Sequence, residues 1–550
     1  MATPDGVDPA PDRETTDQEL AWHTVPESSG PPVEMVAPSD YPELVFALAC
    51  TLGADWRVVR QQLVSELEAC GYDLRLVRLS DQIPNTRSYK NDAERYEALM
   101  DAGDRFRQDR KLPGAVAIAA IKKIREIRDP QSPIAFLLDK LVHPDEVEIL
   151  RAAYGSRLFV IACDSPRSTR LKDIQARFME SGLNADDAAQ AAAHAINRDA
   201  GQALSKRKKF RAISDKYRVS VGKTLEKADV FVRGDSPEKT REIITRLVQC
   251  IFGHPFHTPT LDELGMALAY QAALTSASLS RRVGASIMMG EQIVAVGSNE
   301  VPKAGGGTYH EESWKAGRDA RDFQLGRDPS DRIRLDMLAD LLQGLLGASW
   351  KVPRSKRDMP LRKLAVEVAN ELQGCKLLDV IEYTRTTHAE MVAITAAARR
   401  GISIQGATVF TTTLPCHECT RNIIASGIGR VVYLEPYPKS KGSELQSDSI
   451  YLEAHSREEC QDKLAFEPFS GFVYWRFAEL FSLPSRKVDD LRKKQGKLLQ
   501  YDGESVVWKA RGASIRSSIF HPTYGPAGLV TQFLIENALI ANLDRPSDDK

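Results

Sequence analysis

The residues best suited to chemistry lie in two short segments of this 550-residue chain, His388-Ala389-Glu390 and Pro415-Cys416-His417-Glu418-Cys419. An imidazole nitrogen and two thiolates supply three of the four positions of a tetrahedral zinc ion. The fourth position is then open for water, as in a catalytic rather than a structural site. The two segments therefore predict a Zn²⁺ site made by His388, Cys416 and Cys419.

Glu390 is the residue that we expect to move protons at this site. It follows the histidine by two residues, too close to coordinate the same ion comfortably, but it can reach the water. If Cys416 and Cys419 occupy the first turn of a helix, both sulfurs lie on one face and the helix dipole favours thiolates. His417 stays unassigned. In the alternative interpretation, the cysteines are buried thiols and His388 is a core histidine.

The elements that must position these residues follow a mixed α/β pattern. The sequence predicts a capping box at Thr260-Leu261-Asp262-Glu263 that opens a helix. Two short strands and then two helix–strand pairs follow it. They are the strands Ala285–Met289, Ile293–Val296, Thr408–Thr412 and Arg430–Leu434 and the helices 388–399 and 416–426.

An earlier part of the chain has the pattern of a parallel sheet. An apolar run at Leu44–Ala49, a turn at Gly53, a helical period and a second run at Leu74–Leu79 form a strand–helix–strand unit. Further strands are expected at Ile134–Leu138, Leu158–Cys163 and Val230–Val232. We expect one α/β domain over residues 41–255 and a second over 256–480, with an extension of uncertain fold at 481–550.

Composition limits the function classes. Residues 1–40 hold seven prolines and a charge of −8, typical of a disordered acidic tail, so residues 41–550 carry +7 of the net charge of −1. The chain has no apolar run long enough to span a membrane and no signal-peptide pattern, so we expect a cytoplasmic protein without a membrane partner. A mild positive bias suits an anionic small substrate.

Several segments resemble the cytidine deaminase superfamily and, within it, the deoxycytidylate deaminases. The zinc pattern itself is that of nucleobase deaminases, and Val283-Gly284-Ala285 and Gly297-Ser298-Asn299-Glu300 resemble elements that flank the nucleotide pocket. Asn299–Gly307, Arg321-Asp322-Phe323 and Tyr433–Ser440 resemble the bacterial anti-phage dCTP deaminases.

The resemblance implies a fold, a reaction and partners. The fold is a P-loop nucleoside-kinase-like parallel sheet domain followed by a cytidine-deaminase-like α/β/α domain. The reaction is deamination of dCTP, and also dCMP, to the uracil nucleotide, which depletes a DNA precursor during phage infection. The resemblance also implies a homo-oligomer and a regulatory RNA. It implies that Asn299 binds the deoxyribose hydroxyl, that Tyr433 lines the pocket and that Arg281 or Arg282 binds a phosphate.

The first domain departs from the P-loop pattern. Such a loop needs several glycines, a lysine for the phosphates and a hydroxyl for magnesium. Here the turn Ala47–Asp55 keeps only Gly53 and has an aspartate near its end. We therefore expect a degenerate nucleotide-binding or regulatory module rather than an active kinase.

Two other function classes stay open. Deamination of RNA or single-stranded DNA uses the same zinc chemistry, although the chain shows no clustered basic and aromatic platform. A non-enzymatic nucleotide sensor would use the zinc fold as a scaffold, but a scaffold has no use for Glu390.

Overall fold

The computed structural model gives the fold of most of the chain. It describes residues 43–84, 88–129, 131–201, 213–254, 256–279, 281–326, 329–347, 359–371, 383–437, 440–454, 460, 462–481 and 526–544. The acidic tail expected at residues 1–40 and most of the extension expected at 481–550 lie outside these ranges.

The first of two sheets has six strands in the order β12-β5-β4-β1-β3-β2. Five of them are parallel neighbours, and β12 pairs antiparallel with β5. The strands are β1 (Leu44–Cys50), β2 (Asp73–Arg78), β3 (Ile134–Asp139), β4 (Leu158–Asp164), β5 (Val230–Arg233) and β12 (Gly471–Phe472). The predicted strand–helix–strand unit at the start of the chain is confirmed.

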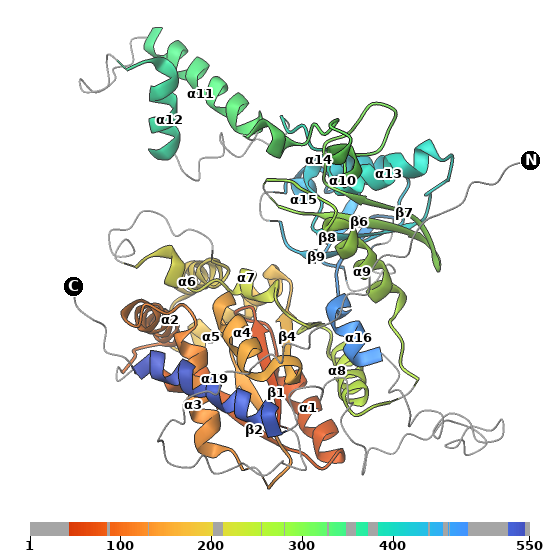
Figure 1. Ribbon diagram of the computed structural model, residues 1–550. Helices are drawn as coiled ribbons and strands as arrows, with labels where there is room; N and C mark the ends of the chain where they lie inside the picture. Colours follow the sequence, from red (N-terminus) through yellow and green to blue (C-terminus); the bar gives the residue numbers. More distant parts are fainter. Residues whose placement is uncertain are drawn as a thin grey trace, which may run out of the picture. The chain divides into compact units, whose positions relative to one another are not determined.

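Both faces of this sheet are buried under helices (Figure 1). Alternate residues of β1 enter opposite cores, with Phe46 on one face and Ala47 on the other, which explains the unbroken apolar run. The helices α1 (Arg57–Ala69) and α8 (Pro237–Ile251) cover the first face. The second face is covered by α3 (Ala115–Ile127), α4 (Pro144–Tyr154) and α7 (Val221–Leu225).

Three more helices pack beside the loop that follows β1. Ile174, Phe178 and Ile196 form a further apolar cluster with Leu52 of the loop after β1. The helices concerned are α5 (Arg167–Glu180) and α6 (Ala185–Asp199), and α2 (Asp92–Asp109) packs beside them.

Segments from late in the sequence return to the first sheet. Phe472 of β12 and Leu480 of α16 (Phe477–Phe481) are fully buried in the same core as β1. The helix α19 (Pro526–Asp544) packs on α3, and its Glu536 accepts hydrogen bonds from Arg128 at 2.7 and 3.1 Å. The helix α19, which belongs to the C-terminal extension, therefore packs against a helix that covers the first sheet.

The second sheet also has six strands, in the order β10-β11-β9-β8-β6-β7. The first four are parallel, whereas β6 runs antiparallel to both β8 and β7. The strands are β6 (Gly284–Met289), β7 (Gln292–Ser298), β8 (Thr408–Thr413), β9 (Arg430–Glu435), β10 (Ile450–Leu452) and β11 (Leu464–Pro468).

Helices cover the second sheet on both faces, which gives an α/β/α sandwich. On one face lies α9 (Leu261–Ala273), which begins at the predicted capping box: Thr260 accepts from the Glu263 backbone N–H, and the Glu263 carboxylate accepts from the Thr260 N–H. On the other lie α13 (Ala389–Arg399) and α14 (His417–Ala425).

Shorter and intervening helices connect these elements. The helices α11 and α12 pack together through Leu338, Leu342, Leu364 and Ala365. Their bounds, with those of the two short helices, are α10 (Glu311–Lys315), α11 (Pro329–Gly347), α12 (Leu361–Glu371) and α15 (Gly442–Leu445). The expected mixed α/β class is confirmed. Within the described ranges, no helix combines the length and apolar character that crossing a bilayer requires.

Gly284 is where α9 approaches β6 most closely. A Cβ at this position would lie 1.9 Å from the carbonyl oxygen of Ala269 and 2.5 Å from the backbone nitrogen of Ala273. Both are backbone atoms, so the helix itself would have to move away from the sheet. The Val283-Gly284-Ala285 segment is thus a packing contact.

We predict that Gly284→Ala lowers the free energy of unfolding by at least about 1–3 kcal/mol, the usual cost of overpacking. Thermal unfolding followed by circular dichroism measures the change. Gly344→Ala is the matched control, because a Cβ at Gly344 meets nothing within 4 Å and alanine favours a helix. An unchanged melting temperature for Gly284→Ala would contradict the close approach.

Candidate metal centre

The three predicted ligands lie together at one end of the second sheet. The Cys416 and Cys419 sulfurs are 3.2 and 3.4 Å from the His388 Nδ1 atom. All three ligand atoms lie within 4.8 Å of one another, and they form the metal-ligand cluster found among the described residues. Cys416 and Cys419 are buried, and His388 is half-buried.

The donor set fits zinc. Bonds of about 2.3 Å to sulfur and about 2.0–2.1 Å to nitrogen in a tetrahedron separate the two ligand atoms by about 3.6 Å. The observed sulfur–nitrogen distances are a few tenths of an ångström shorter, so little movement is needed. One nitrogen and two sulfurs from protein leave a coordination position for a small molecule. Zn²⁺ is therefore the metal that these residues would hold.

Two helix N-termini meet at this point. His388 is the N-cap residue of α13, and Cys416 is the N-cap residue of α14, where its sulfur accepts from the Cys419 backbone N–H at 3.5 Å. A hydrogen bond from Cys419 and the adjacent His388 imidazole lower the pKa of Cys416 to about 4, against the opposing effect of burial. The positive ends of both helices also favour thiolate.

Glu390 faces the same cluster from the first turn of α13. Its Oε2 atom accepts from the Cys419 thiol at 3.4 Å, and its side chain is buried. Burial raises the pKa of this carboxyl group above its ordinary range. A carboxyl group with a raised pKa can exchange a proton near neutral pH, as the predicted general acid and base must.

The position of α13 depends on a second close contact with the sheet. A Cβ at Gly297 of β7 would lie 2.4 Å from the carbonyl oxygen of Ala389 and 2.6 Å from the backbone nitrogen of Ala393. The segment before the helix is held as well, because Thr387 and Glu300 exchange backbone hydrogen bonds at 3.1 and 3.2 Å. These contacts fix the direction in which His388 and Glu390 point.

Glu300 is a positioning residue whose role the sequence did not reveal. Its carboxylate is buried and accepts from the backbone N–H groups of Ala277 and Val301 at 2.7 and 2.8 Å. It thereby joins the loop after α9 to the loop after β7. The only signal in the sequence was its place directly after Asn299.

Two further segments with family resemblance also position the centre. Asp322 accepts from Arg385 at 2.9 Å and from the Thr386 hydroxyl at 3.3 Å, just before His388. Ser440 donates to the carbonyl oxygen of Pro415 at 2.8 Å, just before Cys416. Each therefore holds the backbone that leads into one of the two ligand-bearing helices.

Asn299 lies close to this centre but binds backbone groups. Its side-chain oxygen accepts from the Val283 N–H at 2.7 Å, and its side-chain nitrogen donates to the Arg281 carbonyl at 2.7 Å. The amide can make one more bond at each end. Its expected contact with a sugar hydroxyl stays a prediction.

The side chains of the other two residues expected at the substrate are engaged with other groups. The Arg281 guanidinium pairs with Glu226 at 3.0 Å and Glu435 at 2.7 Å, so binding phosphate requires it to exchange one of them. Tyr433 is buried and lines a separate cavity beside Asp164. The substrate contacts of Arg281 and Tyr433 stay predictions.

Sequence comparison identifies the type of zinc region. Residues 356–435, which include Glu390 and all three ligands, match the model of the cytidine and deoxycytidylate deaminase zinc-binding region. The deoxycytidylate deaminases of Enterobacteria phages T2 and T4 are each 52% identical over 54 residues, 10% of this chain and 29% and 28% of theirs. ComE operon protein 2 of Bacillus subtilis (strain 168) is 40% identical over 65 residues, 12% of this chain and 34% of that protein. The chain thus spans about a third or less of the curated relatives it matches.

A solved structure is also similar. The dCMP deaminase from the cyanophage S-TIM5 in apo form is 15% identical, with a TM-score of 0.21, and the match covers 39% of this chain and 100% of that one. In the same enzyme in complex with dCMP and dUMP, the identity is 17% and the TM-score again 0.21.

Removal of a ligand should remove the metal. We predict that Cys416→Ser and His388→Ala each reduce the zinc content of the purified protein to a small fraction of the wild-type value, because two protein ligands hold zinc far more weakly than three. Inductively coupled plasma mass spectrometry measures the content. His417→Asn is the control and should retain zinc, because His417 is outside the cluster. Full zinc in Cys416→Ser would show that the centre is wrongly assigned.

Glu435 makes stability depend on pH. Burial, and then the charge of Glu226, raise the pKa of Glu435 to about 7 against the attraction of Arg281. The folded state therefore binds the proton more tightly than the unfolded state, and stability falls as pH rises from about 4.5 through 7. We predict that the melting temperature of Glu435→Gln, relative to wild type, increases between pH 5 and pH 8. The exposed Glu68→Gln serves as control; a parallel pH course for wild type and Glu435→Gln would refute the assignment.

Proposed function

We propose that this chain deaminates deoxycytidine nucleotides, dCTP and also dCMP, to the corresponding deoxyuridine nucleotides with release of ammonia. The observation that carries the proposal is the buried Glu390 carboxylate, which lies 3.4 Å from one sulfur of a one-nitrogen, two-sulfur cluster. The names of the phage relatives, which are deoxycytidylate deaminases, support the substrate class.

The chain's own residues divide the work. Bound zinc would make water at the open position acidic enough to react near neutral pH. Glu390 takes a proton from that water and gives it to N3 of cytosine while the oxygen bonds to C4. Glu390 then takes the remaining proton from the new C4 hydroxyl group and gives it to the amino group, so that the C4–N bond breaks, the C4 carbonyl forms and ammonia leaves. Burial raises the pKa of Glu390, so that this carboxyl group can both accept and donate a proton near neutral pH.

Substrate contacts follow from the loops beside the centre. Asn299, tied to the loop that carries Arg281, is our candidate for the deoxyribose hydroxyl. Arg281 is the candidate for phosphate, in exchange for one of its two carboxylates, and Tyr433 is the candidate for the pocket wall.

The remaining expectations complete this proposal. We take residues 41–255 as a degenerate P-loop domain, 256–480 as the deaminase domain, 481–550 as an extension and 1–40 as an acidic tail; within these bounds, β12, α16 and α19 pack with the first domain. The loop after β1 supports the degeneracy, since Asp55 binds the Arg57 N–H at the start of α1. By resemblance to the anti-phage dCTP deaminases, the reaction depletes dCTP during infection in a homo-oligomer responsive to a regulatory RNA.

The role of Glu390 can be tested directly. We predict that Glu390→Gln retains zinc but releases ammonia from dCTP at least about 100-fold more slowly, because the proton-transfer group is lost while the ligands remain. Ammonia release and zinc content are measured on the same preparation.

The wild-type substrate panel provides the control for this experiment. It comprises dCTP, dCMP, CTP, cytidine, a tRNA and a single-stranded oligonucleotide. Turnover of free deoxycytidine nucleotides supports the proposal. Ammonia from the tRNA or the oligonucleotide alone would move the chain to nucleic-acid editing, and near-normal turnover by Glu390→Gln would exclude its role.

A further inference from the structure

The first sheet carries a cavity that the proposed deamination does not use. It lies at the carboxyl ends of β1 and β3 and has a volume of about 280 Å³. After β1 the chain crosses to β2 at one edge of the sheet, and after β3 it crosses to β4 on the other side of β1. The strand order therefore reverses between β1 and β3, and open α/β sheets bind ligands at such a switch point. The volume is just below the range of about 300–1,000 Å³ typical of small-molecule sites, so it suits a compact ligand.

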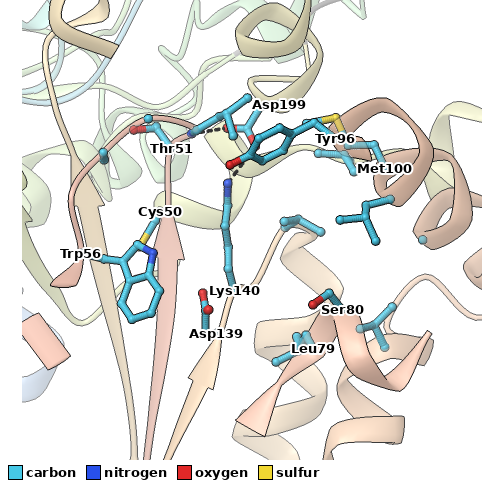
Figure 2. A pocket seen from close by; sticks show the side chains of 18 of the residues that line it. Cys50, Thr51, Trp56, Leu79, Ser80, Tyr96, Met100, Asp139, Lys140 and Asp199 are labelled. Carbon is cyan, nitrogen blue, oxygen red and sulfur yellow. Dashed lines mark hydrogen bonds and ion pairs between the residues drawn. The ribbon is translucent and has the colours of Figure 1, made fainter. Parts of the chain in front are cut away.

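Carboxylates of the chain already hold the groups that would bind an anion here. The backbone N–H of Leu52 donates to Asp199 at 2.8 Å, and the other oxygen of that carboxylate accepts from Lys140 at 3.0 Å (Figure 2). At the start of α1, Asp55 accepts from the Arg57 backbone N–H at 3.0 Å. A phosphate group in this position would be repelled by both aspartates.

The buried cations around the cavity are also paired. Lys140 is neutralised by Asp199, and the buried Arg107 pairs with Glu146 at 2.7 Å and Asp104 at 3.4 Å. Arg177, the other lining cation in the described ranges, is exposed and attracted to Asp55. The interior thus offers a ligand no spare positive charge.

Asp139 is a carboxylate of the cavity wall that accepts no hydrogen bond within the described ranges. Figure 2 shows its carboxylate in the cavity, near the base of the Lys140 side chain. Burial raises the pKa of Asp139, although Lys140 attracts its charge. A carboxylate in this state favours a ligand with N–H or O–H donors.

The walls around Asp139 favour a flat, apolar body. Trp56 and Tyr96 contribute aromatic rings, and Leu79 and Met100 contribute aliphatic surface (Figure 2). Aromatic walls with few polar groups are typical of sites for ring compounds.

We propose that this cavity binds an uncharged nucleoside, whose ring system packs against Trp56 and Tyr96 and whose hydroxyl or amino groups donate to Asp139. Paired cations and occupied anion positions disfavour a nucleoside triphosphate at the same place. Among ring compounds that carry N–H or O–H donors, we choose nucleosides because of the proposed function. The cavity, its lack of free buried cations and the need of Asp139 for a hydrogen-bond donor are independent of that function.

Isothermal titration calorimetry of the full-length protein tests the proposal. Thymidine, deoxyadenosine, deoxyguanosine and deoxycytidine are titrated beside their free bases, their triphosphates and inorganic phosphate. We expect at least one nucleoside to bind, and its triphosphate to bind no more tightly. Asp139→Asn should weaken that binding at least tenfold, the usual effect of losing a charged hydrogen-bond partner.

Two further variants assign the binding to the cavity. Asp81→Asn removes the same charge from an exposed aspartate near the cavity and should leave the affinity unchanged. Met100→Trp fills the space and should abolish binding, while zinc content and ammonia release confirm that the chain is folded.

The proposal is overturned if no nucleoside binds, if only free bases bind, if a triphosphate binds more tightly than its nucleoside, or if Asp139→Asn and Met100→Trp leave the affinity unchanged. An inactive wild-type protein in the ammonia assay would instead overturn the proposed function. The two failures are therefore distinguishable.

Discussion

The candidate centre exists only because two helices begin at the same point. His388 and Cys416 are the N-cap residues of α13 and α14, and the distance of 3.2 Å between their ligand atoms leaves little freedom in either helix. The helix α13 could not lie this close to β7 without a glycine beneath it, because a Cβ at Gly297 would meet the carbonyl oxygen of Ala389 at 2.4 Å. The packing of α13 on β7 therefore helps to set the geometry of the three ligands.

The sequence was most informative where chemistry and local pattern coincide. The ligand types and spacing identified His388, Cys416 and Cys419, and the capping box identified the start of α9, because each signal is carried by segments of only three to five residues. Pairing of β12 with β5 and packing of α19 on α3 were not predicted, because they join segments more than 200 residues apart. Glu300 was missed for another reason: its partners Ala277 and Val301 are near it in the sequence, but their backbone N–H groups carry no signal in the residue types.

In the first sheet, the chain's own carboxylates occupy hydrogen-bond donors at a point where open α/β sheets bind ligands. The sheet's strand order still brings the loop after β1 to a switch point, yet Asp55 and Asp199 occupy the hydrogen-bond donors there. The absence of the P-loop lysine was visible in the sequence. That Asp199, from the end of α6, substitutes for an anion at Leu52 could be learned only from the fold.

The return of the chain to the first sheet has a consequence for biosynthesis. Phe472 and Leu480 fill the core beneath β1, and Glu536 holds Arg128 at the end of α3. A ribosome that has finished β5 has therefore not yet made these residues. While the second sheet is translated, one apolar face of the first sheet lacks the side chains of Phe472 and Leu480. The first core is therefore completed late in synthesis, and a premature stop between β11 and β12 would leave all six strands of the second sheet beside an incomplete first core.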